Sequence, residues 1–567
     1  MEMKGMSRGR SIGLLLFVSL VLLMAMARPV YAETKLTEEM LTEIRARLDR
    51  AVEAGEAEAD LEDMDIIVNM YSDRFSEEYQ KVLDICDDCS AERACFTLGS
   101  HKETYAFILP ETEPVEGSNE YGVGPNKLMS IGIDYDDYYS RPDGSADVGL
   151  IARTQEKLTK EYDVAMSVVS DEMSDVEKAL ALYDYIIAVS NYPPLESIGE
   201  DGVEVYDSES YSGLSVFRDH ISVCVANATA YCYLLSDCGI PCIRVDSDAM
   251  HHSWTMLQVG GAWYHADPTW DNPRYMEGYT CRWDPNNDIW DLGAASHIFF
   301  LKSDDEMTDG LGHYGWSIMA DYTKDGSVDK LPESGPSGSF DNTFFGVNNP
   351  WQEEVHYNYV DGEWYFLNRS ANKIVRTAYG QAEDEARYID APSEQLMKYV
   401  YGGGGCLFIC EDDGIWRYDI KSGEMGRLPL AENSAGNGEP IFTEMNTASG
   451  ALNGVVMYPV HPEDPDEEYD ITFDFAEFSY PLEEVLAMEI IAGTEEEATT
   501  EAGNEDDPQE NPAIPETVIP ESETAIALQE GGSSFSSIVL VGIGVLIGLA
   551  AAAVINSIIL RGNRRRS

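Results

Sequence analysis

One stretch near the C-terminus restricts the fold of this chain more than any other feature. Ile538–Leu560 is almost wholly apolar and carries no charged residue. At about 1.5 Å per residue, a helix of this length crosses a hydrocarbon layer of about 30 Å. Four arginines follow within residues 561–567, and clustered arginines remain on the cytoplasmic side of a membrane. We therefore predict a transmembrane helix over 538–560, a cytoplasmic tail over 561–567, and an ectodomain before them.

The N-terminus has the pattern of an export signal. Basic residues precede an apolar run over residues 12–26, and Val30-Tyr31-Ala32 follows with compact residues at the positions that a signal peptidase requires. We predict a signal peptide over 1–32, with a retained anchor as the alternative. Both ends thus favour a single-pass protein at the cell surface, with its ectodomain outside.

The composition between these ends is strongly acidic. The formal net charge is −66, and such a surface repels nucleic acid and other anionic polymers. Residues 491–537 are rich in Glu, Thr and Pro and can bury little surface, so we predict a disordered linker that holds the folded part away from the membrane.

The 567 residues are too many for a single core. We expect a helical or mixed N-terminal region over 33–165, which is helical to about residue 100. Ser174-Asp-Val-Glu177 is a capping box, and the helix behind it must end before Pro193. This helix belongs to a predicted α+β catalytic domain over 166–300, which a connecting segment over 301–344 follows.

The pattern becomes β-rich over 345–490. Short apolar and aromatic strands alternate with turn signals such as Asp361-Gly362 and Asp413-Gly414. Segments of about 45 residues that start near 349, 392 and 437 are weakly similar, a period typical of propeller blades. Because four or more blades are needed to close a ring, we predict an incomplete propeller-like or sandwich domain.

Cys224 lies where a helix should begin. Apolar residues recur at helical spacing behind it, and Gly239 is a suitable stop. A helix N-terminus lowers the pKa of a thiol. The unpaired backbone N–H groups there, that of Cys224 first, could bind an oxyanion.

A β-hairpin should place a base and an acid together. Gly260-Gly261 is a two-residue turn signal. If Val259 pairs with Ala262, strand alternation makes His252 and Asp267 diagonal neighbours on one face and turns His251 to the other. A thiolate, an imidazole and a carboxylate that orients it are the parts needed for nucleophilic acyl transfer.

Residues 170–280 resemble the transglutaminase-like superfamily, papain-like enzymes with Cys, His and Asp in this chain order, here in a bacterial-type cell-surface protein. The motifs are Tyr211-Ser-Gly-Leu214, Val223-Cys224, Gly239-Ile-Pro241, His252-Ser-Trp254 and Trp263-Tyr-His-Ala-Asp267-Pro-Thr-Trp270-Asp271. The resemblance implies that Cys224 is the nucleophile, His252 the general base and acid, and Asp267 the residue that orients His252.

The chain departs from the family pattern at three places. Ser222 replaces a usual glycine, Val225-Ala226-Asn227 replaces a sequence such as Glu-Gly-Tyr, and Asn272 replaces a second aspartate. The predicted triad itself is intact.

Three aromatic residues are predicted near the cleft. Tyr211 could line it beside Cys224, and Trp254 and Trp270 could contact a substrate. Packing of the two tryptophans between the hairpin and the Cys224 helix is the more common use of such residues.

The sequence indicates no cofactor. The acidic stretch around Asp284–Asp291 could bind calcium, although its spacing is not that of an EF-hand. Cys86, Cys89 and Cys95 could be local disulfides or free thiols, and a metal site is the weaker interpretation. Asn227-Ala-Thr229 is one of two glycosylation sequons.

Two functions are compatible with these patterns. The first is an extracellular cysteine enzyme that acts on peptide or side-chain amide bonds of a protein or peptide substrate, such as one in the cell envelope, by hydrolysis or transamidation. The alternative is an inactive surface module that uses the same fold and the β-rich domain to bind proteins.

Overall fold

The fold comes from a computed structural model of the full chain. It describes residues 33–492 except 72–74, 116–117, 119–122, 194–196, 199–203, 273–281, 285–288, 292–295, 310, 352–354, 431–440, 448–449 and 461–471. The predicted signal peptide, transmembrane helix, tail and nearly all of the linker lie outside the described residues. So do residues 285–288 of the predicted calcium-binding stretch. Among the helices described, none is long and apolar enough to span a bilayer. Contacts divide the chain into two compact units at Glu495, and all described residues belong to the first.

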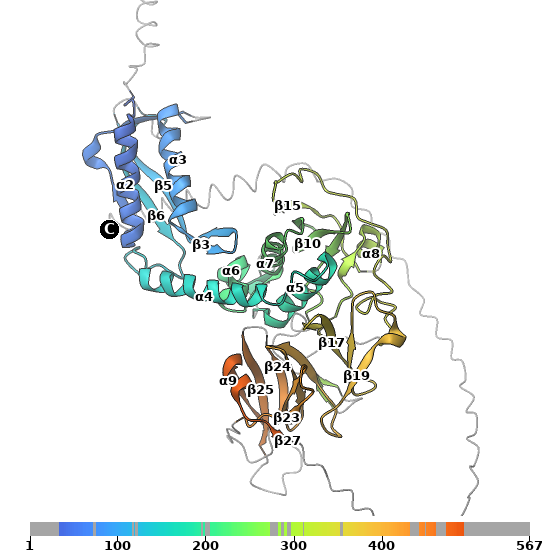
Figure 1. The fold of residues 1–567 in the computed structure, drawn as a ribbon. Helices are drawn as coiled ribbons and strands as arrows, with labels where there is room; N and C mark the ends of the chain where they lie inside the picture. The colour runs from blue at the N-terminus through green and yellow to red at the C-terminus, as the bar shows by residue number, and fades with distance from the viewer. Residues whose placement is uncertain are drawn as a thin grey trace, which may run out of the picture. The chain divides into compact units, whose positions relative to one another are not determined.

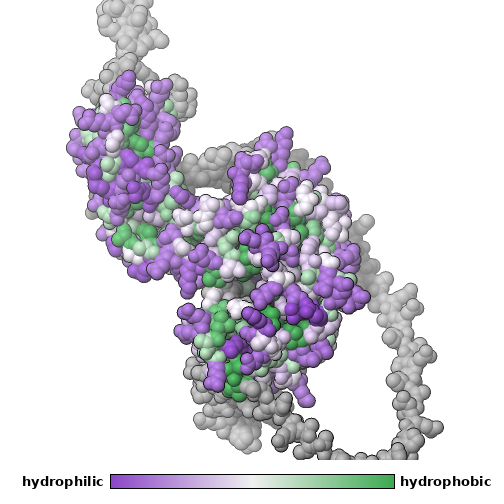
Figure 2. All heavy atoms as spheres, in the orientation of Figure 1, coloured by the Kyte–Doolittle hydropathy of each residue, from purple (hydrophilic) through white to green (hydrophobic). Residues whose placement is uncertain are grey.

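The N-terminal region contains more β structure than its sequence predicts. Helices α2 and α3 lie side by side next to β5 and β6 (Figure 1), and hydrophilic side chains cover most of their visible face (Figure 2). Strand β6 is the centre of a sheet with β1, β2 and β5, and β3 pairs with β4. The bounds are α2 Glu38–Ala54, β1 Glu58–Asp60, β2 Ile67–Met70, α3 Glu77–Glu92, β3 Cys95–Leu98, β4 His101–Thr104, β5 Ala106–Pro114 and β6 Gly124–Tyr135.

The prediction that residues 33–100 are helical is therefore wrong in part. The helix that begins after the N-cap Thr37 is confirmed as α2, but strands separate α2 from α3 and follow α3. The strands within residues 33–100, β1, β2 and β3, are only three or four residues long, which is too short for a clear alternation of apolar and polar residues.

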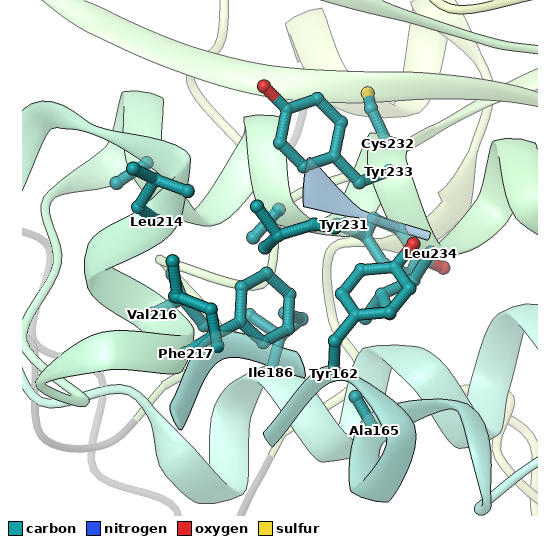
Figure 3. Packing of buried hydrophobic residues seen from close by; sticks show 14 of the residues in the cluster. Tyr162, Ala165, Ile186, Leu214, Val216, Phe217, Tyr231, Cys232, Tyr233 and Leu234 are labelled. Atoms are coloured by element: carbon teal, nitrogen blue, oxygen red, sulfur yellow. The ribbon is translucent and has the colours of Figure 1, made fainter. Parts of the chain in front are cut away.

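Helices α4 to α7 form a bundle, in which residues 179–189 of α5 are all buried. The predicted capping box is confirmed, since Ser174 and Glu177 bond each other's backbone N–H groups. Side chains of α4, α5, α6 and α7 meet in one core (Figure 3), in which the rings of Tyr162 and Phe217 pack edge to face at 5.3 Å. The helices are α4 Val148–Met166, α5 Asp175–Val189, α6 Gly213–Arg218 and α7 Cys224–Asp237.

A five-stranded antiparallel sheet packs against α7. Its strand order is β14-β11-β10-β9-β15, and β10 lies beside α7 (Figure 1). The strands are β9 Cys242–Ser247, β10 His252–Val259, β11 Ala262–Ala266, β14 Phe300–Lys302 and β15 Ser317–Asp321, with the short helix α8 Asp304–Asp309 between the last two. Short strand pairs lie apart from this sheet: β7 Ser197–Ile198 with β8 Glu204–Val205, and β12 Arg282–Asp284 with β13 Ile289–Asp291.

In its described residues, the β-rich part consists of three antiparallel sheets in chain order. They begin at Asn358, Tyr399 and Ile441, close to the predicted repeat starts. None of the sheets in the described residues closes into a barrel. The strands are β16 Asn358–Val360, β17 Glu363–Asn368, β18 Lys373–Thr377 and β19 Arg387–Asp390; β20 Tyr399–Gly403, β21 Cys406–Glu411, β22 Gly414–Asp419 and β23 Met425–Arg427, joined by β27 Ile491–Ala492; and β24 Ile441–Asn446, β25 Ala451–Val460 and β26 Thr472–Pro481, followed by α9 Leu482–Ala487.

The predicted turns of this part are close to the observed ones. Asp361 and Gly362 both have positive φ and join β16 to β17 as predicted. The next predicted turn is wrong by one residue, because Gly414 pairs with Glu411 and leaves Asp412-Asp413 as the turn.

Helix α5 is bonded to the first of these sheets. The Glu177 carboxylate accepts the indole N–H of Trp364 at 3.0 Å. Asp184, a buried acid, accepts the backbone N–H of Tyr357 at 2.6 Å and contacts His297 at 2.7 Å. Burial raises the pKa of Asp184, although His297 opposes that change.

Glu177 both completes the capping box of α5 and accepts the indole N–H of Trp364. Its substitution should therefore remove two interactions at once. Glu177→Ala removes the capping box and leaves the buried Trp364 N–H without an acceptor, so we expect the free energy of unfolding to fall by about 2 kcal/mol. Denaturant unfolding of the full chain followed by tryptophan fluorescence measures it. Glu177→Gln, which retains one carbonyl acceptor, is the matched control and should lose less. Equal losses for the two variants would contradict this account.

Candidate active site

Cys224 is the first residue of α7, as the sequence predicts. The N-cap is Val223, and its side chain caps no N–H group of the helix. A valine cannot accept a hydrogen bond, so the N–H groups of the first turn lack the usual side-chain partner. Cys224 is partly exposed, which leaves its thiol accessible beside these donors.

The hairpin register is confirmed. Val259 pairs with Ala262 and Thr255 with Ala266, and Gly260 and Gly261 both have positive φ. The His252 Nε2 and Asp267 Oδ2 atoms lie 2.6 Å apart. His251 is exposed and precedes the strand.

The thiol of Cys224 completes a row of three groups. Its interaction with the His252 side chain raises the pKa of that imidazole. Because Asp267 engages Nε2, Nδ1 is the ring nitrogen left for the thiol. Cys224, His252 and Asp267 thus interact in the order that nucleophilic catalysis requires.

The electrostatics of His252 and Asp267 favour an ion pair. Burial by itself lowers the pKa of His252, but Asp267 and Cys224 together raise it to about 10. Burial also opposes ionisation of Asp267, yet His252 and His313 hold the pKa of that carboxyl well below its usual range. The contribution of His252 to folding stability is complete below its ordinary pKa of 6.5 and is lost as the pH rises through about 10.

His313 is a member of this site that the sequence analysis missed. Its Nε2 lies 3.0 Å from the same Oδ2 atom of Asp267, and the residue is fully buried. Oδ1 of Asp267 accepts the backbone N–H groups of Thr269 at 3.0 Å and Trp270 at 3.3 Å. No sequence signal points to His313, because it lies in the loop after α8 and outside any strand or helix.

His252, Asp267 and His313 are also the kind of residues that bind zinc. Their potential ligand atoms lie within 4.8 Å of one another. Ligand atoms around a tetrahedral zinc ion are about 3.3 Å apart, whereas both imidazoles lie closer than that to the carboxylate, at 2.6 and 3.0 Å. The observed spacing is that of direct hydrogen bonds.

The three predicted cleft aromatics have different surroundings. Tyr211 is 42 % exposed and ends a turn whose Ser210 carbonyl accepts the N–H of Val223, so it lies near the start of α7. Trp270 stacks on His252 with ring centroids 5.1 Å apart. Its indole N–H has no hydrogen-bond partner in the described part of the chain.

Trp254 does not pack between the hairpin and α7, and that prediction is wrong. Thr255 faces α7, since its hydroxyl donates to the Ala228 carbonyl at 3.2 Å. Strand alternation therefore turns Trp254 to the opposite face, where it packs in a core with Met307 and other apolar residues. Its indole N–H donates to His265 Nδ1 at 2.9 Å.

The three departures from the family pattern are bonded in one buried network. Asn227 accepts the hydroxyls of Ser222 at 2.6 Å and Ser190 at 2.8 Å, and it donates to Thr269 at 3.1 Å. Asn272 donates to the Ser190 carbonyl at 2.9 Å. Because the Asn227 amide is buried and bonded, this sequon is not accessible in the folded protein.

Asp271 anchors the segment 267–271, which follows the hairpin and begins with Asp267. It accepts the Tyr183 hydroxyl at 2.5 Å and the backbone N–H groups of Ile298 and Phe299 at 3.1 and 2.9 Å. Burial raises the pKa of Asp271 to about 6, although these hydrogen bonds favour the charged form. The acid ties α5, the end of the hairpin and residues 296–299 together.

Cys86, Cys89 and Cys95 lack the features of a second reactive site. In the described part of the chain, Cys86, Cys89 and Cys95 are free thiols, as are the remaining described cysteines. Burial raises the pKa of each of these three thiols, which makes them less nucleophilic.

A cavity of about 550 Å³ lies away from the triad. Its lining includes Asp184 and Tyr185 of α5, Tyr359 of β16, and the glycines of residues 402–405. None of Cys224, His252 and Asp267 contributes to the lining. The cavity is therefore a feature separate from the candidate active site.

Comparison with known proteins identifies few similar ones. No protein-family model matches the chain, and no curated protein matches it. A solved structure titled "Crystal structure of a TGase" is similar over 31% of this chain, with 14% sequence identity and a TM-score of 0.19. The chain spans 46% of the length of that structure.

Removal of the carboxylate should change the protonation of His252. In Asp267→Asn, burial is the main influence on the pKa of His252. We therefore expect this pKa to fall from about 10 to below the ordinary histidine value. NMR titration of protein labelled at histidine Cε1 measures the change. Asp248→Asn, which removes an exposed acid four residues from His252, is the control and should leave the titration unchanged. A high His252 pKa in Asp267→Asn would contradict the ion pair.

Proposed function

We propose that this protein is a transglutaminase-like cysteine enzyme that cleaves or exchanges amide bonds through a thioester. The interaction of His252 with both Cys224 and Asp267, at a helix N-terminus without a side-chain cap, carries this proposal. Each group then has one role: Cys224 attacks, His252 transfers the proton, and Asp267 orients His252.

The reaction proceeds in two steps. The Cys224 thiolate attacks the amide carbonyl carbon, and N–H groups in the first turn of α7 stabilise the oxyanion. The C–N bond breaks as His252 donates its proton to the leaving amine, which leaves a thioester. Water or a second amine, deprotonated by His252, then attacks the thioester, and the C–S bond breaks to restore the thiol.

We further propose that the enzyme acts at the cell surface. The signal peptide over 1–32, the linker over 491–537 and the helix over 538–560 would hold the catalytic domain over 166–300 outside the membrane. The substrate would then be a protein or peptide, such as one in the cell envelope. The net charge of −66 disfavours nucleic acid.

A protein-binding module is the second candidate function. The cavity lined by α5, residues 356–362 and residues 401–405 supports it, because such a concave surface could hold a ligand without Cys224. In that case the β-rich part over 345–490 would supply the binding surface.

Selective alkylation of Cys224 tests the enzyme proposal. At pH 7 we expect iodoacetamide to label Cys224 at least about tenfold faster than Cys238, as measured by mass spectrometry of peptides from the full chain. Cys238 is an internal control because it lies at the other end of α7, is also partly exposed, and has a pKa raised by burial.

A variant of the base completes this test. His252→Ala should slow the labelling of Cys224 about tenfold or more, because the thiol loses its proton acceptor, and should leave Cys238 unchanged. Equal labelling rates for the two cysteines, together with no effect of His252→Ala, would exclude an activated thiol and favour the binding module.

The fate of the thioester decides between hydrolysis and transamidation. We expect hydrolysis to exceed amine incorporation, because no amine-binding site is evident in the described residues, whereas water is always available. Incubation of glutamine-containing peptides with a dansylated primary amine, with ammonia and dansyl incorporation measured together, gives the ratio. The Cys224→Ser variant is the blank. Incorporation greater than hydrolysis would assign the enzyme to the transferases.

A further inference from the structure

His313 is enclosed by aromatic side chains in the candidate active site. Its backbone N–H donates to the Met307 carbonyl at 2.9 Å. Its ring contacts Trp270 at 4.3 Å, Trp254 at 4.7 Å and Phe299 at 5.2 Å between centroids. A residue so enclosed has one orientation, so its two nitrogens have fixed partners.

Both ring nitrogens of His313 face oxygen acceptors. Nδ1 lies 3.2 Å from the Leu311 carbonyl oxygen and Nε2 lies 3.0 Å from Asp267 Oδ2. A neutral imidazole has one N–H group and can donate only one of these bonds, whereas the imidazolium form donates both. A neutral ring would also aim a lone pair at one of these two oxygens, which is unfavourable.

The Asp267 carboxylate is consequently shared. Oδ2 faces His252 at 2.6 Å and His313 at 3.0 Å, and Oδ1 accepts the N–H groups of Thr269 and Trp270. These four contacts fix the carboxylate in place. Its negative charge then acts on two imidazoles, and the second competes with the first.

We propose that His313 is a positioning residue of this site, which holds Asp267 in place and, as an imidazolium, takes up part of the negative charge that would otherwise act on His252 alone. This inference rests on the proposed function. A His252 that binds its proton too tightly is a poor acid toward the leaving amine. By weakening the pull of Asp267, His313 makes that proton easier to release.

Other charges near the two imidazoles leave this argument intact. His252 also faces the thiol of Cys224. His313 acts electrostatically on His265, which is paired on its other side with Asp304 at 2.8 Å. The second buried acid, Asp271, has its oxygens occupied by Tyr183 and residues 296–299. Asp267 is therefore the one described acid that bonds both His252 and His313.

The test is a titration of His252 in the full chain with Cys224→Ser, which removes the thiol from the titration. Protein labelled with ¹³C at histidine Cε1 is titrated by NMR, with and without His313→Gln. Glutamine can still donate one N–H group to Asp267 but carries no charge. We expect the His252 midpoint to rise by about one pH unit, since the carboxylate then acts on a single imidazole.

The control is Asp304→Asn, which neutralises the partner of His265 and should leave the His252 midpoint unchanged. A static or lowered midpoint in His313→Gln, in a protein that retains its folded spectrum, would overturn the inference and leave His313 a packing residue. His313→Leu, which removes both the charge and the hydrogen bond, should raise the midpoint as well. The titration does not measure enzyme activity. A negative result would therefore contradict the role of His313 alone, whereas the labelling of Cys224 tests the proposed enzyme function.

Discussion

The geometry of the candidate site depends on a single buried carboxylate. Asp267 contacts two imidazoles and accepts two backbone N–H groups, so it joins the hairpin, the turn after it and the loop after α8. Its desolvation would be costly without these partners. The same contacts that offset that cost also orient His252 toward Cys224. The contacts of Asp267 therefore determine both the stability and the geometry of the site.

The parts of the site that could be predicted from the sequence are those fixed by local rules. A two-glycine turn sets the hairpin register, and the register alone puts His252 beside Asp267. The helix behind Cys224 follows from spacing and a terminal glycine. His313 could not be found in this way, because only the tertiary fold brings its loop to Asp267. The same limit explains Trp254, since alternation gives its neighbours on a face but not which layer covers that face.

The departures from the family pattern also make sense only in three dimensions. Taken singly, Ser222, Asn227 and Asn272 are polar residues near a catalytic helix. In the structure each bonds Ser190 or a residue bonded to it, so every buried polar group in the set has a partner. Such a network is sensitive to the loss of any member. The three positions therefore act together to support the start of α7.

The hydrogen bonds between α5 and the first β-rich sheet limit where the chain can be truncated without loss of stability. A chain cut after residue 344 would lose the Tyr357 N–H that Asp184 accepts and the Trp364 indole that Glu177 accepts. The cut would expose to water one side of α5, whose residues from Ala179 to Val189 are all buried. The unit that survives proteolysis should therefore include both the helical bundle and the first sheet, so that the smallest stable fragment is larger than the region with the triad.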